Sequence, residues 1–211
     1  MSLERILTDG EVEGLQEALA EQPSAANDPV GVTSDSRHPI HAICDYVFEG
    51  RLLEDVALPM VSALIAHGAD VNHRHTKTND SLLITACSLA APQVAVALID
   101  AGADIHTKGF GATALHWSAM LGMPLSAASL LQARADCGLL DDEYQSTPLG
   151  WAMQGWKSPP KGSKGEQIKC AVLLVKAGSP VDPQWLHSEK IRYEPALFDL
   201  LKARCGDSPE K

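Results

Sequence analysis

Three histidines lie close together in the chain, and histidine is a common metal ligand and a general base near neutral pH. They are His67, His73 and His75. In an extended segment, a spacing of two places His73 and His75 on one face, where two imidazoles could hold a divalent metal. A metal site normally needs three or four rigidly held ligands. We therefore interpret this segment as a solvated turn, and we predict no metal and no cofactor.

A run of three carboxylates could do acid–base chemistry. It consists of Asp141, Asp142 and Glu143, but no apolar pocket is implied around it, so we expect a solvated, charged turn. Phosphate-binding glycine loops, a GxSxG nucleophile elbow and a CxxC pair are all missing from the sequence. We therefore predict no catalytic residues and do not expect an enzyme.

The elements that would position these residues repeat along the chain with a period of about 33 residues. Four similar phrases are LIAHGADVN (64–72), LIDAGADIH (98–106), LLQARADCG (130–138) and LLVKAGSPVD (173–182). A second kind of phrase precedes each of them: HPIHAI (38–43), SLLITA (81–86), TALHWS (113–118) and TPLGWA (147–152). The two kinds of phrase keep the same period and stay in phase.

Each repeat is predicted to form two short helices. In the third repeat, Thr113 can cap a helix that ends near Leu121, and Pro124 can begin the next helix. One such unit cannot bury its apolar faces alone, and stacking against neighbouring units solves that problem.

These phrases resemble the TPLHxA and GADVN motifs of the ankyrin repeat. The resemblance is carried by Thr113, Leu115, His116, Thr147, Pro148, Leu149, Gly68, Ala69, Asp70, Val71, Asn72, Gly102, Ala103 and Asp104. It is weaker at Ser81, Leu82, Ile84, Gly150, Ser179 and Pro180. The resemblance implies an all-α fold: an ankyrin-repeat solenoid of stacked helix–turn–helix units with short hairpin or extended tips. It also implies that His41 and His116 form structural hydrogen bonds to neighbouring backbone.

We expect a single ankyrin-repeat domain over residues 1–211, with unusual repeats at both ends that present polar faces to water. The N-terminal cap covers 1–30, and a C-terminal capping helix covers 188–204. Four repeats cover 36–75, 79–106, 111–138 and 145–182. Insertions lengthen the first repeat at 49–58 and the fourth at 155–165. We expect the first insertion to be partly helical and the second, rich in Gly, Pro, Ser and Lys, to be a mobile loop.

The resemblance also implies that the tips and the inner helices form the binding surface, because variable residues on a rigid frame are typical of recognition. The predicted partner-binding residues are Phe110, Trp117, Tyr144, Trp151, His73, His75 and Lys108. Trp117 and Trp151 occupy the same position in successive phrases, so they should lie side by side, with Gly150 making room for a ring. They could form an exposed aromatic patch or fill gaps between helices; we favour the second, because Trp is usually well buried.

The formal net charge is −10, which disfavours binding to nucleic acid or to an anionic membrane. We see no secretory signal and no apolar run of membrane-spanning length, and five widely spaced cysteines are typical of reduced thiols. We therefore expect a cytoplasmic monomer that binds another protein, with a basic surface, as an adaptor or inhibitor. Two alternatives remain open: a small-ligand or metal-binding protein or hidden enzyme on a repeat frame, and an acidic regulator that masks a basic nucleic-acid-binding partner.

Overall fold

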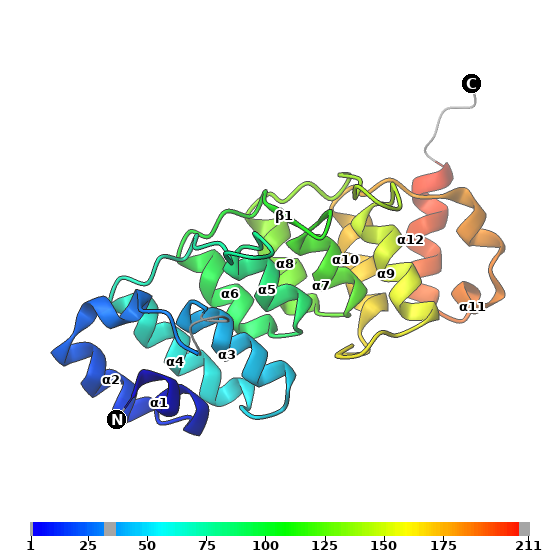
Figure 1. Cartoon of the computed structure of the whole chain (residues 1–211). Helices are drawn as coiled ribbons and strands as arrows, with labels where there is room; N and C mark the ends of the chain where they lie inside the picture. The colour runs from blue at the N-terminus through cyan, green and yellow to red at the C-terminus, as the bar shows by residue number, and fades with distance from the viewer. Residues whose placement is uncertain (1, 32–36, 207–211) are drawn as a thin grey trace. The chain divides into compact units, whose positions relative to one another are not determined.

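The computed structural model describes residues 2–31 and 37–206; residue 36, where the first repeat is expected to begin, lies outside the described residues. Over these ranges the chain forms twelve α-helices, two short 3-10 helices and two strands of two residues each (Figure 1). The predicted all-α class is confirmed. None of the helices in these ranges combines the length and the apolar character that crossing a membrane requires. The chain divides into two compact units, Met1–Phe110 and Gly111–Lys211, which are described separately.

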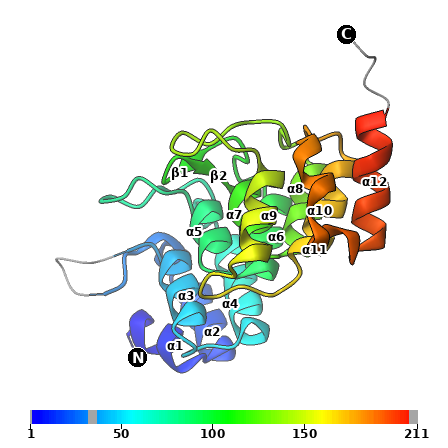
Figure 2. The same ribbon diagram turned by 90° about the vertical axis from the view of Figure 1, so that its right-hand side faces the viewer.

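The first unit packs its helices in two layers. Its elements are α1 (Leu3–Asp9), α2 (Val12–Glu21), the 3-10 helix η1 (Pro23–Asn27), α3 (Pro39–Phe48), α4 (Glu54–Ala66), α5 (Leu82–Ser88), α6 (Pro92–Asp100) and β1 (Lys108–Gly109). Helix α3 contacts α1 and α5 in one layer, and α4 contacts α2 and α6 in the other. Consecutive helices also pair across the layers, as α3 with α4 and α5 with α6 (Figure 2).

The second unit follows the same plan of paired helices. Its elements are β2 (Ala112–Thr113), α7 (Ala114–Met120), α8 (Pro124–Gln132), α9 (Pro148–Lys157), α10 (Gln167–Lys176), the 3-10 helix η2 (Pro183–His187), α11 (Glu189–Arg192) and α12 (Pro195–Gly206). Helix α7 packs on α9, while α10 packs on α8 and α12. Helix pairs α7–α8 and α9–α10 join the two layers.

The four motif phrases each begin a helix, as predicted. The N-cap residues are His38, Ser81, Thr113 and Thr147. Ser81 Oγ accepts a hydrogen bond from the Ile84 backbone N–H, which satisfies one donor that the first helical turn leaves without an intrahelical partner. These caps fix where the first helix of each pair begins.

A residue with a left-handed backbone follows two residues after the end of the second helix of each pair. Gly68, Gly102 and Gly178 have φ of 86°, 88° and 99°, a conformation that glycine adopts without steric cost. Arg134 stands at the matching position and has φ of 69°. The alignment of the four phrases therefore corresponds to a backbone feature that all four share.

The two insertions differ in structure. Helix α4 begins at Glu54, so the second half of the 49–58 insertion is helical, as expected. At 155–165, α9 continues to Lys157, and the Lys164 backbone N–H donates to the Leu121 carbonyl at 2.7 Å. The segment predicted as a mobile loop is therefore partly helical and is attached to the end of α7.

The C-terminal capping helix predicted over 188–204 is wrong as a single element. The structure has α11 and then α12, with a break at Tyr193 and Glu194. Pro195 has no backbone N–H to donate to Ile191, and its ring disfavours a helical conformation at Glu194. Pro195 instead occupies the first position of α12, where a missing N–H costs nothing.

Candidate functional site

An open groove of about 660 Å³ in the second unit is lined mainly by aromatic and sulfur-containing side chains. We call it the aromatic groove. Its principal lining residues are Met120, Tyr144, Trp151, Met153, Lys157 and Trp185. They come from α7, the turn before α9, α9 itself and η2. Four segments that are separate in the sequence therefore build one apolar depression.

Asp141 fixes the orientation of Trp151 at this groove. The carboxylate is 1 % exposed; its Oδ1 accepts hydrogen bonds from the backbone N–H groups of Glu143 (2.9 Å) and Tyr144 (2.6 Å). Its Oδ2 accepts one from Ser146 N (2.9 Å) and one from Trp151 Nε1 (3.0 Å). The indole is thus held at its polar edge, which leaves its apolar faces for packing.

Electrostatics keep Asp141 ionised. Burial alone raises the pKa of this carboxyl, but the hydrogen bonds from Tyr144, Ser146 and Trp151 outweigh burial and lower the pKa below its usual value. We expected a solvated turn at 141–143. That interpretation holds for Asp142 and Glu143, which are exposed, and is wrong for Asp141 because the turn closes around its carboxylate.

Trp117 and Trp151 lie side by side, as their matching positions predict. Their ring centroids are 5.2 Å apart at an interplanar angle of 83°, an edge-to-face contact. Tyr144 meets Trp151 at 6.4 Å and is 68 % exposed. Both indoles are half-buried, so they neither fill the core completely nor stand free in solvent. The structure thus places three of the predicted binding residues in one cluster.

Gly150 leaves room for a side chain of the turn before α9. A Cβ at this position would lie 2.1 Å from Ser146 Oγ, and the next residue that it would meet is Thr147, whose hydroxyl oxygen would be 3.9 Å away. The expectation that this glycine also makes room for an indole ring stays a prediction.

His116 has the structural role that the ankyrin resemblance implies. Its Nδ1 accepts from the Thr113 backbone N–H (3.3 Å) and lies 2.8 Å from the Thr113 hydroxyl, and its Nε2 lies 3.1 Å from the Ser146 carbonyl oxygen. A carbonyl can only accept, so Nε2 carries the proton. Both ring nitrogens are engaged in structure, which leaves no lone pair for catalysis.

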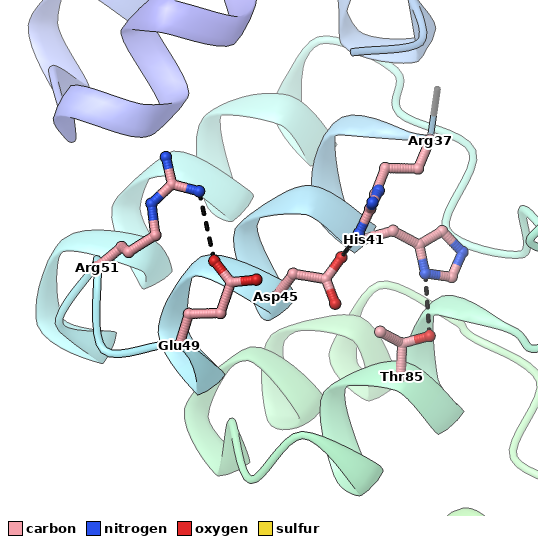
Figure 3. Close-up of polar contacts among 6 residues, drawn as sticks. All are labelled: Arg37, His41, Asp45, Glu49, Arg51 and Thr85. Atoms are coloured by element: carbon pink, nitrogen blue, oxygen red, sulfur yellow. Dashed lines mark hydrogen bonds and ion pairs between the residues drawn. The ribbon is translucent and has the colours of Figure 1, made fainter. Parts of the chain in front are cut away.

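His41 occupies the same motif position but binds differently. Its Nδ1 lies 2.9 Å from Thr85 Oγ1 (Figure 3), so its partner is a side chain rather than the expected backbone. The reason is the first residue of the motif phrase, three positions before the histidine. This residue is His38 in the first repeat and Thr113 in the third. The His38 ring caps α3 by accepting from Ile40 N at 3.2 Å.

His73 and His75 pack against these two histidines in the first unit. The His73 ring stacks on His38 with centroids 4.9 Å apart, and the His75 ring meets His41 edge-on at 5.4 Å. His75 Nδ1 accepts from backbone N–H groups of the following turn, and His67 bonds the Ala63 carbonyl instead of joining the cluster. Within residues 2–31 and 37–206, no group of three or more His, Cys, Asp or Glu side chains could hold a metal ion.

The two remaining predicted residues also belong to the first unit. Lys108 is half-buried in β1, and Phe110 is 64 % exposed with φ of 53°. Phe110 lines a small pocket with His75 in the first unit, whereas Tyr144 belongs to the second. The predicted residues are therefore divided between two surfaces.

Sequence reasoning missed four of the six principal residues of the aromatic groove: Met120, Met153, Lys157 and Trp185. Trp185 lies in η2, which begins at Pro183 with Asp182 as its N-cap, and an Asp–Pro pair is a readable helix-start signal. Nothing in the local sequence indicates that this tryptophan faces α9.

No protein-family model matches the chain, and no curated protein is similar to it. The geometry of the two units therefore carries the functional argument.

Proposed function

We propose that this chain is a protein-binding module whose paired helices stack as in ankyrin-repeat proteins and whose partner docks in the aromatic groove. On this proposal the chain is an adaptor or inhibitor rather than an enzyme. The observation that carries it is the exposure of Tyr144 beside two half-buried tryptophans, Trp151 and Trp185, in an open groove. Tyr and Trp are enriched among the residues that dominate binding energy at interfaces.

The groove suits an apolar partner segment. Met120 and Met153 line it, and thioether side chains adapt to irregular apolar surfaces. Because Asp141 holds the Trp151 ring in one orientation, little rotamer freedom is lost when a partner binds. Lys157, exposed at the groove, would favour a partner that carries a carboxylate next to its apolar residues.

The test is site-specific photo-crosslinking in the cells that make the protein. A photoreactive phenylalanine analogue replaces Tyr144 in one sample and Tyr193 in the other. Tyr193 is 85 % exposed, lies in the same unit and does not line the groove, so it is the matched control. We expect one protein to crosslink at position 144 and not at position 193.

A second arm uses pull-down with Tyr144→Ala, which removes an exposed ring and should leave the fold intact. The partner crosslinked at 144 should be captured by the wild type and by Tyr193→Ala, and lost with Tyr144→Ala. Equal crosslinking at both positions, or capture by Tyr144→Ala at the wild-type level, would exclude the groove as the docking surface.

A further inference from the structure

One face of helix α9 borders the aromatic groove along the whole length of the helix. Gly150, Gln154 and Lys157 line the groove and are spaced by four and three residues, so they lie on one face of α9. Tyr144 belongs to the turn before α9, and Lys157 is the last residue of the helix. The groove therefore follows α9 from its first turn to its end.

The length of this face limits the length of an extended segment that could lie along it. Helix α9 has ten residues, which at about 1.5 Å per residue gives about 15 Å. A polyproline II helix, the extended form that proline-rich chains adopt, rises about 3.1 Å per residue. A segment of about five residues in this conformation would therefore match the length of the groove.

Three side chains at the groove carry N–H groups without a partner in the protein. Within residues 2–31 and 37–206, the side chains of Gln154, Lys157 and Trp185 form no hydrogen bond or ion pair. Gln154 and Lys157 are exposed, and Trp185 is half-buried. All three can donate, and only Gln154 can also accept. An occupant that presents carbonyl oxygens and few N–H groups of its own would match this set.

The walls of the groove disfavour the other common conformations of a bound peptide. A bound β-strand needs an unpaired sheet edge, whereas this groove is built from α7, α9, η2 and a turn. A bound α-helix uses its backbone carbonyls internally, so its backbone would leave the three donors of the groove without partners. A polyproline II segment has no internal hydrogen bonds, and its prolines carry no N–H.

The two ends of the groove differ in charge. The turn at the Tyr144 end contains three consecutive carboxylates, those of Asp141, Asp142 and Glu143. Hydrogen bonding to Glu143, and then its charge, raises the pKa of the Tyr144 hydroxyl. The other end carries the exposed ammonium group of Lys157. A segment with a basic residue at one end and an acidic residue at the other would complement both ends.

We propose that the aromatic groove binds a proline-rich segment of the partner protein in the polyproline II conformation, with a basic residue beside Tyr144 and an acidic residue beside Lys157. This inference rests on the proposed protein-binding function and names the chemistry of the partner. Proline-rich segments dock in grooves lined by aromatic side chains, and their preformed conformation limits the entropy that is lost on binding. The carbonyl oxygens of the segment accept hydrogen bonds from Gln154 and Trp185.

The test is an NMR titration of the full-length protein, read at the indole N–H signals of its four tryptophans. The first probe is the peptide acetyl-Arg-Pro-Pro-Leu-Pro-Pro-Glu-amide, and the second has alanine in place of every proline. We expect the proline peptide to shift the Trp151 and Trp185 signals saturably. Trp156 does not line the groove, so its signal should stay in place. The alanine peptide should bind at least about tenfold more weakly.

Two variants locate the binding site of the proline peptide. Tyr144→Ala should weaken binding at least about fivefold, because it removes an aromatic ring at the groove. Tyr193→Ala removes an exposed ring outside the groove and should bind like the wild type. The comparison of the proline and alanine peptides uses the wild type alone, so it holds even if a variant does not fold.

The inference is overturned if millimolar proline peptide leaves the Trp151 and Trp185 signals in place, or if the two peptides bind the wild type equally. Unchanged binding to folded Tyr144→Ala would also overturn it. Competition against the partner crosslinked at position 144 separates this inference from the proposed function. A crosslinked partner that the proline peptide does not displace would overturn this inference alone. The absence of any crosslinked partner would overturn the proposed function and this inference with it.

Discussion

At the scale of single residues, two histidines at one motif position do different work because their neighbours differ. His116 stands three residues after Thr113. Its Nδ1 bonds Thr113, and its Nε2 bonds the Ser146 carbonyl. His41 stands three residues after His38, whose own ring caps α3, and the His41 ring bonds Thr85. Its Nε2 has no hydrogen-bond partner among residues 2–31 and 37–206. The motif predicts the structural role of His116. It cannot predict that of His41, because the deciding contact comes from α5.

The burial of His38 and His41 makes the stability of the first unit sensitive to acid. Burial, followed by the charge of His73, lowers the pKa of His38 to about 4, and the pKa of His41 is about 3. In the unfolded chain both rings titrate near pH 6.5. The unfolded state therefore binds more protons below pH 6.5, and stability falls as the pH decreases toward the two folded-state values.

We predict that His41→Gln removes part of this pH dependence. Between about pH 7.5 and about pH 4.5, the free energy of unfolding of the wild type should fall by about 2 to 3 kcal/mol more than that of the variant. Urea denaturation followed by far-UV circular dichroism at several pH values measures the difference. Asp45, whose pKa burial raises, acts in the opposite direction in both proteins and so cancels in the comparison. Parallel pH curves for the two proteins would mean that the His41 ring is not held neutral by burial.

At the scale of elements, the helices were the most predictable part of the fold. Each motif phrase contains its own cap, and proline begins α3, α6, α8 and α9, so local chemistry fixes where these helices start. The break at Pro195 was readable in the same way, but Ile191 and Leu201 continue the apolar spacing on both sides of it and are both buried. The apolar spacing therefore predicts one continuous helix, whereas Pro195 predicts a break. The break forms because proline has no backbone N–H to donate to the preceding turn.

The aromatic groove was less predictable than the helices. Trp117 and Trp151 share a repeat position, so the period alone predicts their contact. Trp185 lies outside the repeated phrases. Asp141 is one of three consecutive acidic residues, and nothing in the sequence distinguishes it from the two exposed ones. Both residues contribute to the groove through tertiary contacts with α9, and the sequence alone does not indicate which segments come into contact.

Helix α9 approaches α7 closely at one glycine. A Cβ on Gly155 would lie 2.2 Å from the backbone carbonyl oxygen of Met120, far inside van der Waals contact. Backbone atoms cannot rotate away as a side chain can. We predict that Gly155→Ala lowers the free energy of unfolding by about 1 to 3 kcal/mol, because the two helices must separate to accept the methyl group.

The matched control is Gly14→Ala, in the first turn of α2. Its nearest neighbour is the flexible Glu11 side chain at 3.3 Å, so the alanine should raise stability by about 0.5 to 1 kcal/mol through helix propensity. Urea denaturation of both variants beside the wild type measures the two effects. If Gly155→Ala is as stable as the wild type, α7 and α9 do not pack this closely in solution.

At the scale of the whole molecule, charge is unevenly distributed along the chain. Residues 1–30 contain seven acidic side chains and one basic side chain, and Glu13, Glu17 and Glu21 are all exposed on or at the end of α2. Exposed charge of one sign steers the approach of an oppositely charged partner but adds little to the final contact energy. We call Glu13, Glu17 and Glu21 the N-terminal acidic surface. This surface should act on the association rate constant of partner binding, and the aromatic groove should act on the dissociation rate constant.

We predict this separation for the partner identified by crosslinking at Tyr144, measured by surface plasmon resonance. For the wild type, the association rate constant should fall when the salt concentration rises from about 50 mM to about 500 mM, because salt screens exposed charges. Glu13→Gln/Glu17→Gln should lower the association rate constant about two- to fivefold at low salt, with an unchanged dissociation rate constant. Tyr144→Ala should raise the dissociation rate constant and leave the association rate constant unchanged, since loss of a packed interface residue acts mainly on dissociation. A salt-independent association rate would mean that the partner is not basic, and an acidic-surface variant that changes only dissociation would place those glutamates inside the interface.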